Sequence, residues 1–242
     1  MLVKIKNFLI RSIILHLPIR ELVLRQIRWE MHAIWADINN LFNPLYILRL
    51  KKIKRMDNLS VNVGCAATGK SGWINLDIRR YPLVTLIYNC RKGLPFRKDT
   101  VLRIRCEHFL EHLYHKEAPL FLRSCFLCLK KGGILRVIVP DAERFLMAYV
   151  SKRKEDWLSL GWDLDNLPKG FKTPMDVINF VFRQEEEHLY AYDFQTLELL
   201  LREAGFKKIY KTAFRVSVDP ELCDDLASYY RHSLYVEAIK EI

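Results

Sequence analysis

The order of short apolar runs and helical stretches constrains the fold of this chain more than any other feature. After Asn58, runs of strand-like composition recur along the chain, and segments with helical spacing separate several of them. The predicted strands are Val61–Val63, Trp73–Ile78, Val84–Tyr88, Val101–Cys106, Ile134–Val139, Lys208–Val216 and Ser233–Ile239. Helices are predicted from about Phe109 and over Phe194–Ala204, where Gly205 supplies a stop. Strands that alternate with helices favour an α/β fold with a mostly parallel sheet.

The first 57 residues differ from the rest, and we predict a basic helical arm there, attached to a domain over 58–242. The chain carries 39 Lys and Arg against 28 Asp and Glu, a net charge of +11, and most of this excess lies before residue 56. Apolar residues recur at helical spacing over Ile19–Asn43, and we expect a shorter basic helix over 1–17. We interpret the arm as a helical segment packed on the domain. An anionic membrane surface or a protein partner bound through residues 1–55 are the alternatives.

Residues 151–187 interrupt the alternation and predict a lid-like insertion at the edge of the sheet. Six scattered cysteines, in a chain of 242 residues, indicate reduced thiols and a cytoplasmic protein, peripheral at a membrane if the arm binds lipid. The CxxC pair Cys125 and Cys128 lies in a helical stretch without a second pair, so we expect core packing rather than zinc. No run approaches the roughly 20 apolar residues of a membrane span.

A small-residue loop follows the first predicted strand and forms a candidate nucleotide site. The loop Gly64, Cys65, Ala66 lets backbone amides approach a ligand at the carboxyl edge of a parallel sheet. Asp77 ends the next strand, where a carboxylate can accept hydrogen bonds from both hydroxyls of a ribose. The short spacing leaves little room for a helix between the two strands.

Further along the chain, motifs in a fixed order resemble one family. They are Val61 to Cys65, Gly72 to Asp77, Gly93 to Phe96, His108 to Leu113, Leu129 to Leu135, Val139 to Asp141 and His188 to Asp193. Together they resemble class I S-adenosylmethionine-dependent methyltransferases, in the bacterial and archaeal branch with a Gly-Trp-Ile-Asn-Leu-Asp motif. The resemblance covers about residues 59–240 and implies a Rossmann-like, doubly wound sheet.

That resemblance also implies roles for particular residues. Gly64 to Ala66 would lie beside the methionine part of S-adenosylmethionine, and Asp77 would bind its ribose. Asn89 stands where the family usually has an aspartate near the adenine, and Leu94 follows in the Leu-Pro-Phe turn. Cys106 and Glu107 would face the region of methyl transfer. Candidate bases toward the acceptor are His108, Asp141 and His188.

The segment from His108 to His112 also matches the HxxEH zinc signature, which gives a rival interpretation. On a helix, His108 and His112 would share a face as ligands, with Glu111 as the general base. Third-ligand candidates are Glu185, Glu186, Glu187 and His188. The same letters occur in the methyltransferase pattern without a metal, so we assign no metal ligand and keep a metallopeptidase as a minor alternative.

Our sequence-based prediction is methyl transfer from S-adenosylmethionine to an O or N atom of a small molecule, sugar or lipid-linked intermediate. The near balance of charge after the arm disfavours nucleic acid as the substrate. Ala66 replaces the second glycine of the family's Gly-x-Gly loop, and Asn89 lacks the usual charge. Both departures favour, as the alternative, a non-catalytic methyltransferase-like binding or scaffold subunit.

Overall fold

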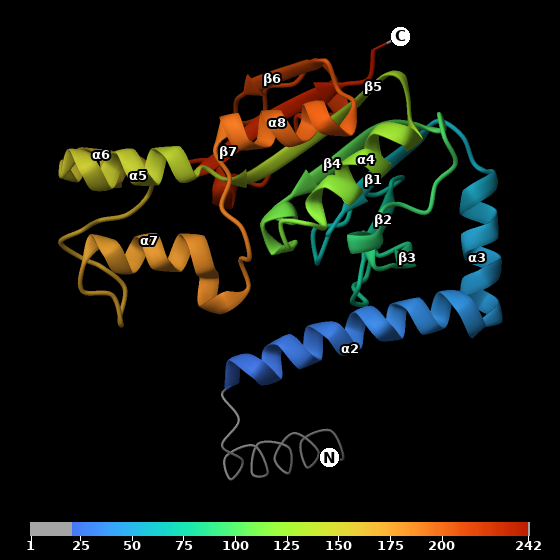
Figure 1. Cartoon of the computed structure of the whole chain (residues 1–242), viewed down its shortest axis with the longest axis horizontal. Coiled ribbons are helices and arrows are strands. Elements are labelled where there is room, and N and C mark those ends of the chain that lie inside the picture. Colours follow the sequence, from blue (N-terminus) through green and yellow to red (C-terminus); the bar gives the residue numbers. More distant parts are fainter. Residues whose placement is uncertain (1–20, 242) are drawn as a thin grey trace.

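The computed structural model describes residues 21–241 and builds them around a seven-stranded sheet (Figure 1). The strand order is β3-β2-β1-β4-β5-β7-β6. The strands are β1 (Leu59–Val63), β2 (Ile74–Asp77), β3 (Leu86–Ile87), β4 (Val101–Glu107), β5 (Leu129–Pro140), β6 (Lys208–Thr212) and β7 (Ser233–Ile239). Strands β1 to β5 pair in parallel, whereas β7 is antiparallel to both β5 and β6. This order, with its antiparallel β7, is typical of the class I methyltransferase Rossmann-like fold, so the predicted fold class is confirmed.

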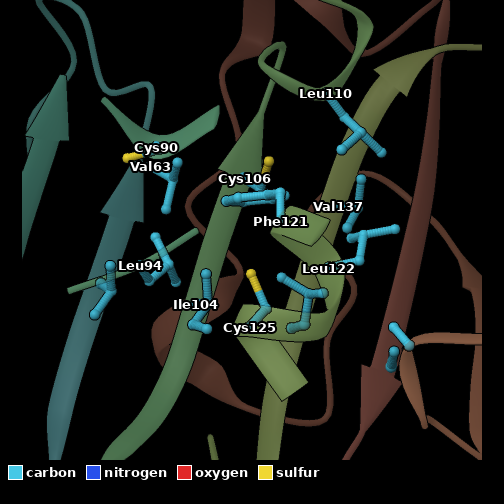
Figure 2. Packing of buried hydrophobic residues seen from close by; sticks show 14 of the residues in the cluster. Val63, Cys90, Leu94, Ile104, Cys106, Leu110, Phe121, Leu122, Cys125 and Val137 are labelled. Carbon is cyan, nitrogen blue, oxygen red and sulfur yellow. The ribbon is translucent and has the colours of Figure 1, made fainter. Parts of the chain in front are cut away.

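The two faces of the sheet differ in how they are covered. Helices α4 (Ala118–Cys128) and α8 (Phe194–Ala204) lie together over one face, and Cys125 packs there in the main core with Ile104 and Phe121 (Figure 2). The opposite face carries Arg136, which binds Asp225 and Glu237 while fully buried. Irregular chain with short 3-10 turns at η4 (Pro220–Leu222) and η5 (Ala227–Tyr229) contributes partners to this polar layer.

The arm and the insertion both form helices. The arm contains α2 (Glu21–Phe42) and α3 (Pro44–Arg55), and α3 begins at a Pro whose preceding Asn43 side chain caps the Leu45 amide. After β5 come α5 (Ala142–Ser151), α6 (Lys154–Ser159) and α7 (Pro174–Arg183), which enclose a second, smaller core. No helix within residues 21–241 has the length and apolar character needed to cross a bilayer. The helix predicted over 1–17 lies outside the described residues.

Several helix and strand boundaries in the structure differ from those predicted from the sequence. The strand predicted over Val84–Tyr88 is confined to two residues, and the one predicted over Lys208–Val216 ends at Thr212. The helix predicted from Phe109 is wrong: only a 3-10 turn, η2 (Leu110–His112), follows β4, and α4 begins at Ala118 next to Pro119. Leu110 and Leu113 are buried by this turn, so their spacing reflects packing at the strand end rather than a helix face.

Candidate functional site

The chain after β1 turns sharply without a helix. Gly64 adopts a φ of +63°, and a Cβ at this position would lie 2.7 Å from the Phe109 ring. Both strain and contact therefore require glycine here. The amides of Gly64 and Cys65 donate to the Leu76 carbonyl at 2.9 and 3.2 Å, which ties the turn to β2. As the spacing predicted, no helix forms between β1 and β2.

Asp77 closes this turn from the end of β2. Its Oδ2 accepts a hydrogen bond from the Ala66 amide at 2.9 Å, and its Oδ1 accepts one from the Arg79 amide at 2.8 Å. Burial raises the pKa of Asp77, although these two hydrogen bonds oppose the shift. Each carboxylate oxygen retains a second lone pair for an incoming hydroxyl. The structure thus brings Asp77 and the Gly64–Ala66 loop together.

Helix α2, predicted as part of an arm packed on the domain, covers this same edge of the sheet, a position that the sequence did not indicate (Figure 1). Asn40 of α2 donates to the Ile87 carbonyl at the end of β3, and the Trp29 ring lies under the Arg79 guanidinium at 3.9 Å. Asn89 is only 3% exposed, and its amide nitrogen donates to Asp37 of α2 at 3.4 Å. An α2 side chain therefore already contacts the residue expected beside adenine.

Three further predicted cofactor residues take part in packing or pairing. Leu94 and Cys106 belong to the main core, where Figure 2 shows Cys106 beside Phe121. Glu107 forms a buried ion pair with Arg105, and its Oε1 accepts a hydrogen bond from the Leu226 amide. Cys106 and Glu107 are neighbours on β4, so they face opposite sides of the sheet. Only one of the two can therefore face a given site beside the strand.

His108 lies directly after β4, and both of its ring nitrogens have hydrogen-bond partners. Its φ is +49°, and its Nδ1 lies 2.9 Å from Glu111 Oε1. Its Nε2 lies 3.0 Å from the hydroxyl of Ser233 at the start of β7. A carboxylate that holds one ring nitrogen orients a histidine for proton transfer at the other. Sequence reasoning missed Ser233, because β7 is far away in the chain.

The Glu111 carboxyl is buried beside three histidines. Burial would raise its pKa, but the hydrogen bond from His108 and the surrounding histidines outweigh this, and the pKa lies below its ordinary value. A ring nitrogen of His112, a ring nitrogen of His188 and a carboxylate oxygen of Glu111 all lie within 4.8 Å of one another. Burial lowers the pKa of His188, opposed by the nearby Glu111 carboxylate. These three side chains have the chemistry to hold a metal ion.

The metallopeptidase geometry does not form. His108 and His112 do not share a helix face, because the segment is a 3-10 turn after a residue of positive φ. Both ring nitrogens of His108 are engaged, by Glu111 and Ser233. Of the predicted third ligands, His188 alone joins the cluster found among residues 21–241.

Asp141 serves as a structural cap. It is 1% exposed, and its Oδ1 accepts from the Arg144 amide in the first turn of α5. Burial raises its pKa, opposed by this bond and by Lys211. The backbone of Asp141 also forms an isolated parallel β-bridge with Tyr192, which joins the end of β5 to the segment after His188.

A broad, open cavity of about 490 Å³ lies apart from these residues. Its lining includes Lys70, Trp73, Arg105 and Glu221, and none of the predicted site residues. It belongs to the polar side of the sheet, where η4 approaches the loop between β1 and β2.

Comparison with known proteins finds likeness in structure and none in sequence. No family model matches the chain, and no curated protein matches it. Its structural neighbours include S-adenosylmethionine-dependent methyltransferases. One from Thermotoga maritima is 16% identical, with a TM-score of 0.44, covering 90% of this chain and 96% of that one. Another from Methanosarcina mazei is 15% identical, with a TM-score of 0.46, covering 80% and 97%. At such identities these likenesses concern the fold alone.

Proposed function

We propose that the protein binds S-adenosylmethionine and transfers its methyl group to an O or N atom of a small molecule, sugar or lipid-linked acceptor. The observation that carries this proposal is the hydrogen bond from the Ala66 amide to Asp77, at the carboxyl edge of a sheet with methyltransferase strand order. It joins a tight glycine turn to an acidic side chain, which is what a nucleoside with a charged tail requires.

In this proposal, the cofactor lies along the edge formed by β1, β2 and β4. The Gly64–Ala66 loop, whose amides hold it against Leu76 and Asp77, would lie beside the methionine part of the cofactor, and Asp77 would accept from its ribose hydroxyls. Methyl transfer is an in-line displacement, so holding donor and acceptor in line supplies much of the rate. His108, oriented by Glu111, is our candidate base for an acceptor hydroxyl or amine, which would replace the Ser233 hydroxyl at Nε2. Asp141 caps a helix, and we assign it a structural role.

A non-catalytic binding subunit is the second candidate, and the contacts of α2 favour it. Asn89 donates to Asp37, and Arg91 beside it forms an ion pair with Glu30 at 2.6 Å. If α2 remains in this position, the adenine side of the edge stays covered. Such a protein would bind neither cofactor nor acceptor with measurable affinity.

Labelled methyl transfer separates the two candidates. Purified protein is incubated with methyl-labelled S-adenosylmethionine and fractions of a bacterial extract, and counts are followed into small molecules, lipids and protein. We expect label in the small-molecule or lipid fraction. A boiled sample and the Asp77→Ala variant serve as controls, and label in none of the fractions would favour the binding subunit.

We also propose that α2 and α3 place the protein at an anionic membrane surface. On α2, Ala33 and Ala36 are 1% and 0% exposed, and they share a helix face with Asn40, which donates to the Ile87 carbonyl. The outer side of the two helices exposes large apolar side chains: Val23, Ile27, Met31, Ile34, Trp35, Ile38, Leu41, Phe42, Leu45 and Leu48. The last turn of α3 is basic, with Lys52, Lys54 and Arg55. An apolar face flanked by cations suits the boundary between acyl chains and anionic headgroups.

Vesicle binding tests this placement. Replacing Met31, Trp35 and Leu41 by Ser removes outer-side contacts without touching the packed alanines. We expect at least a tenfold loss of binding to vesicles of phosphatidylserine and phosphatidylcholine, from about 1 kcal/mol or more per buried side chain. Leu199→Ser on α8 is the matched control, since Leu199 is similarly exposed. Equal vesicle binding by the triple variant would instead assign the face to a protein partner.

A further inference from the structure

Three side chains from two distant segments converge beside the end of β4. Glu111 and His112 belong to η2, whereas His188 follows α7 and the 3-10 turn η3 (Gln184–Glu186). The amides of Leu189 and Tyr190 donate to the Glu111 carbonyl at 2.7 and 3.2 Å, which fixes the second segment against the first. The ligand atoms of the three side chains lie within 4.8 Å of one another.

Both histidines are oriented in the way that metal ligands are. His112 Nδ1 lies 2.9 Å from the Glu187 carbonyl, and His188 Nδ1 lies 2.7 Å from the Val181 carbonyl. A carbonyl can only accept, so each Nδ1 carries the proton and each Nε2 keeps a lone pair. Metal-bound histidines have this arrangement, with the second ring nitrogen donating to a carbonyl or carboxylate. The two rings meet edge to face, with centroids 5.0 Å apart.

Glu111 supplies an independent indication of a ligand. It is 1% exposed, and its Oε1 is bonded to His108. Its Oε2 is buried and has no hydrogen-bond partner among residues 21–241. A buried carboxylate oxygen without a partner is costly, and a cation removes that cost. The Tyr192 hydroxyl is also buried without a partner within the described chain. Glu111, His188 and Tyr192 line one small cavity of about 10 Å³.

We propose that Glu111, His112 and His188 bind a divalent transition metal ion, with Zn²⁺ the best fit. Two imidazole nitrogens and one carboxylate oxygen match the donors that zinc takes in three-ligand sites, and Mg²⁺ or Ca²⁺ would need oxygen ligands throughout. The cavity has room for about one water, which can complete a tetrahedron and bond to Tyr192. Zinc ligands lie about 2.0–2.1 Å from the ion, so the three donor atoms move closer together when it binds.

This site is separate from the proposed cofactor residues Gly64–Ala66 and Asp77, but it shares Glu111 with the candidate base His108. The ion would join the segment after α7 to the strand end of β4, and so would fix the insertion over the acceptor side of the sheet edge. His188 Nε2 would then be a ligand and not a base, which leaves His108 as the candidate for proton transfer. Glu111 would serve both groups, with Oε1 on His108 and Oε2 on the metal.

The test uses the full-length protein without cofactor. After treatment with a chelator, ZnCl₂ is titrated while bound metal and the melting temperature are measured. We expect one zinc per chain and a melting temperature that rises with zinc. His112→Gln and His188→Gln should each weaken zinc binding about 100-fold or more, and should lose the rise in melting temperature.

His115→Gln is the matched control, because His115 is exposed, meets the Tyr190 ring edge to face and lies outside the cluster. It should bind zinc like the unmodified protein. Should either glutamine variant fail to fold, Co²⁺ absorption of the unmodified protein gives a second readout, with visible bands typical of four-coordinate cobalt. Absence of stoichiometric zinc binding, or equal loss in His115→Gln, would overturn the proposal. None of these outcomes depends on S-adenosylmethionine.

Discussion

The two halves of the carboxyl edge of the sheet present different chemical groups. On the side of β1 and β2, a glycine turn and Asp77 meet through backbone amides, and α2 lies over them. On the side of β4 and β5, His108, Glu111 and His188 form a cluster of side chains beneath the end of α7. The first half suits a nucleoside with a charged tail, and the second suits proton transfer and a metal. The comparison indicates that cofactor binding and acceptor chemistry can be impaired separately.

The largest expected effect is a loss of cofactor affinity when Asp77, in the β1 and β2 half of the edge, is replaced. Asp77→Ala removes two charge-assisted hydrogen bonds to ribose and the anchor of the Ala66 amide, so S-adenosylmethionine affinity should fall about 1000-fold. Calorimetric titration measures this. Asp99→Asn is the control, since Asp99 is exposed and paired with Lys240 away from the site. Unchanged affinity in Asp77→Ala would refute the ribose assignment.

The next largest effect is a loss of kcat when His108, in the β4 and β5 half of the edge, is replaced. His108→Gln keeps a polar group of similar reach but removes the base, so kcat should fall about 100-fold while cofactor affinity stays within twofold of the unmodified value. Initial rates of labelled transfer across pH measure kcat, and calorimetry measures binding. A matching loss of cofactor affinity would show that the two halves are not separable.

Acid stability should also report on the second half. Burial, with the charges of His108 and Arg144, lowers the pKa of His232 to about 4, against about 6.5 in an unfolded chain. The unfolded state therefore binds more protons between about pH 6.5 and 4, and stability falls as pH falls through this window. Allowing for partial exposure, the loss is about 2 kcal/mol. Urea unfolding at pH 7 and pH 4.5 should show a smaller difference for His232→Asn; an equal difference would contradict this assignment.

The smallest expected effect tests the loop itself. Ala66 has a φ of +42°, a conformation that costs a side chain about 1 kcal/mol or more. Ala66→Gly relieves this cost and adds entropy to the unfolded chain, for a net stabilisation of about 0.5 kcal/mol. Ala67→Gly is the control, because Ala67 is not among the residues of positive φ and should lose stability. Melting temperatures measure the stability of both variants. A lower melting temperature for Ala66→Gly would contradict the claim that the Ala66 backbone is strained.

Much of the first half could be predicted because its signal is local. Gly64 and Asp77 lie 13 residues apart, each at the end of a strand that its own composition predicts, and parallel pairing brings the strand ends together. The helix itself was predicted over Ile19–Asn43, but its position over this edge was not, because the contacts of Asn40 and Asp37 depend on how the arm folds back. No periodicity within α2 encodes that direction.

The second half depends on contacts between distant segments. His188 reaches Glu111 only after the insertion folds, and Ser233 reaches His108 only because β7 is antiparallel to β5. The sequence did indicate the residue types, since the HxxEH letters and His188 were both singled out. The arrangement of these side chains could not be predicted, because a 3-10 turn after a residue of positive φ stands where a helix was expected.

Calorimetric titration of S-adenosylmethionine into the unmodified protein tests the central claim most directly. The account predicts saturable binding with one cofactor per chain, which S-adenosylhomocysteine should displace. Zinc-loaded and chelator-treated protein should both bind it, because the two halves of the edge are separate. Absence of binding in both samples would contradict a cofactor site at Gly64–Ala66 and Asp77, and with it the proposed methyl transfer.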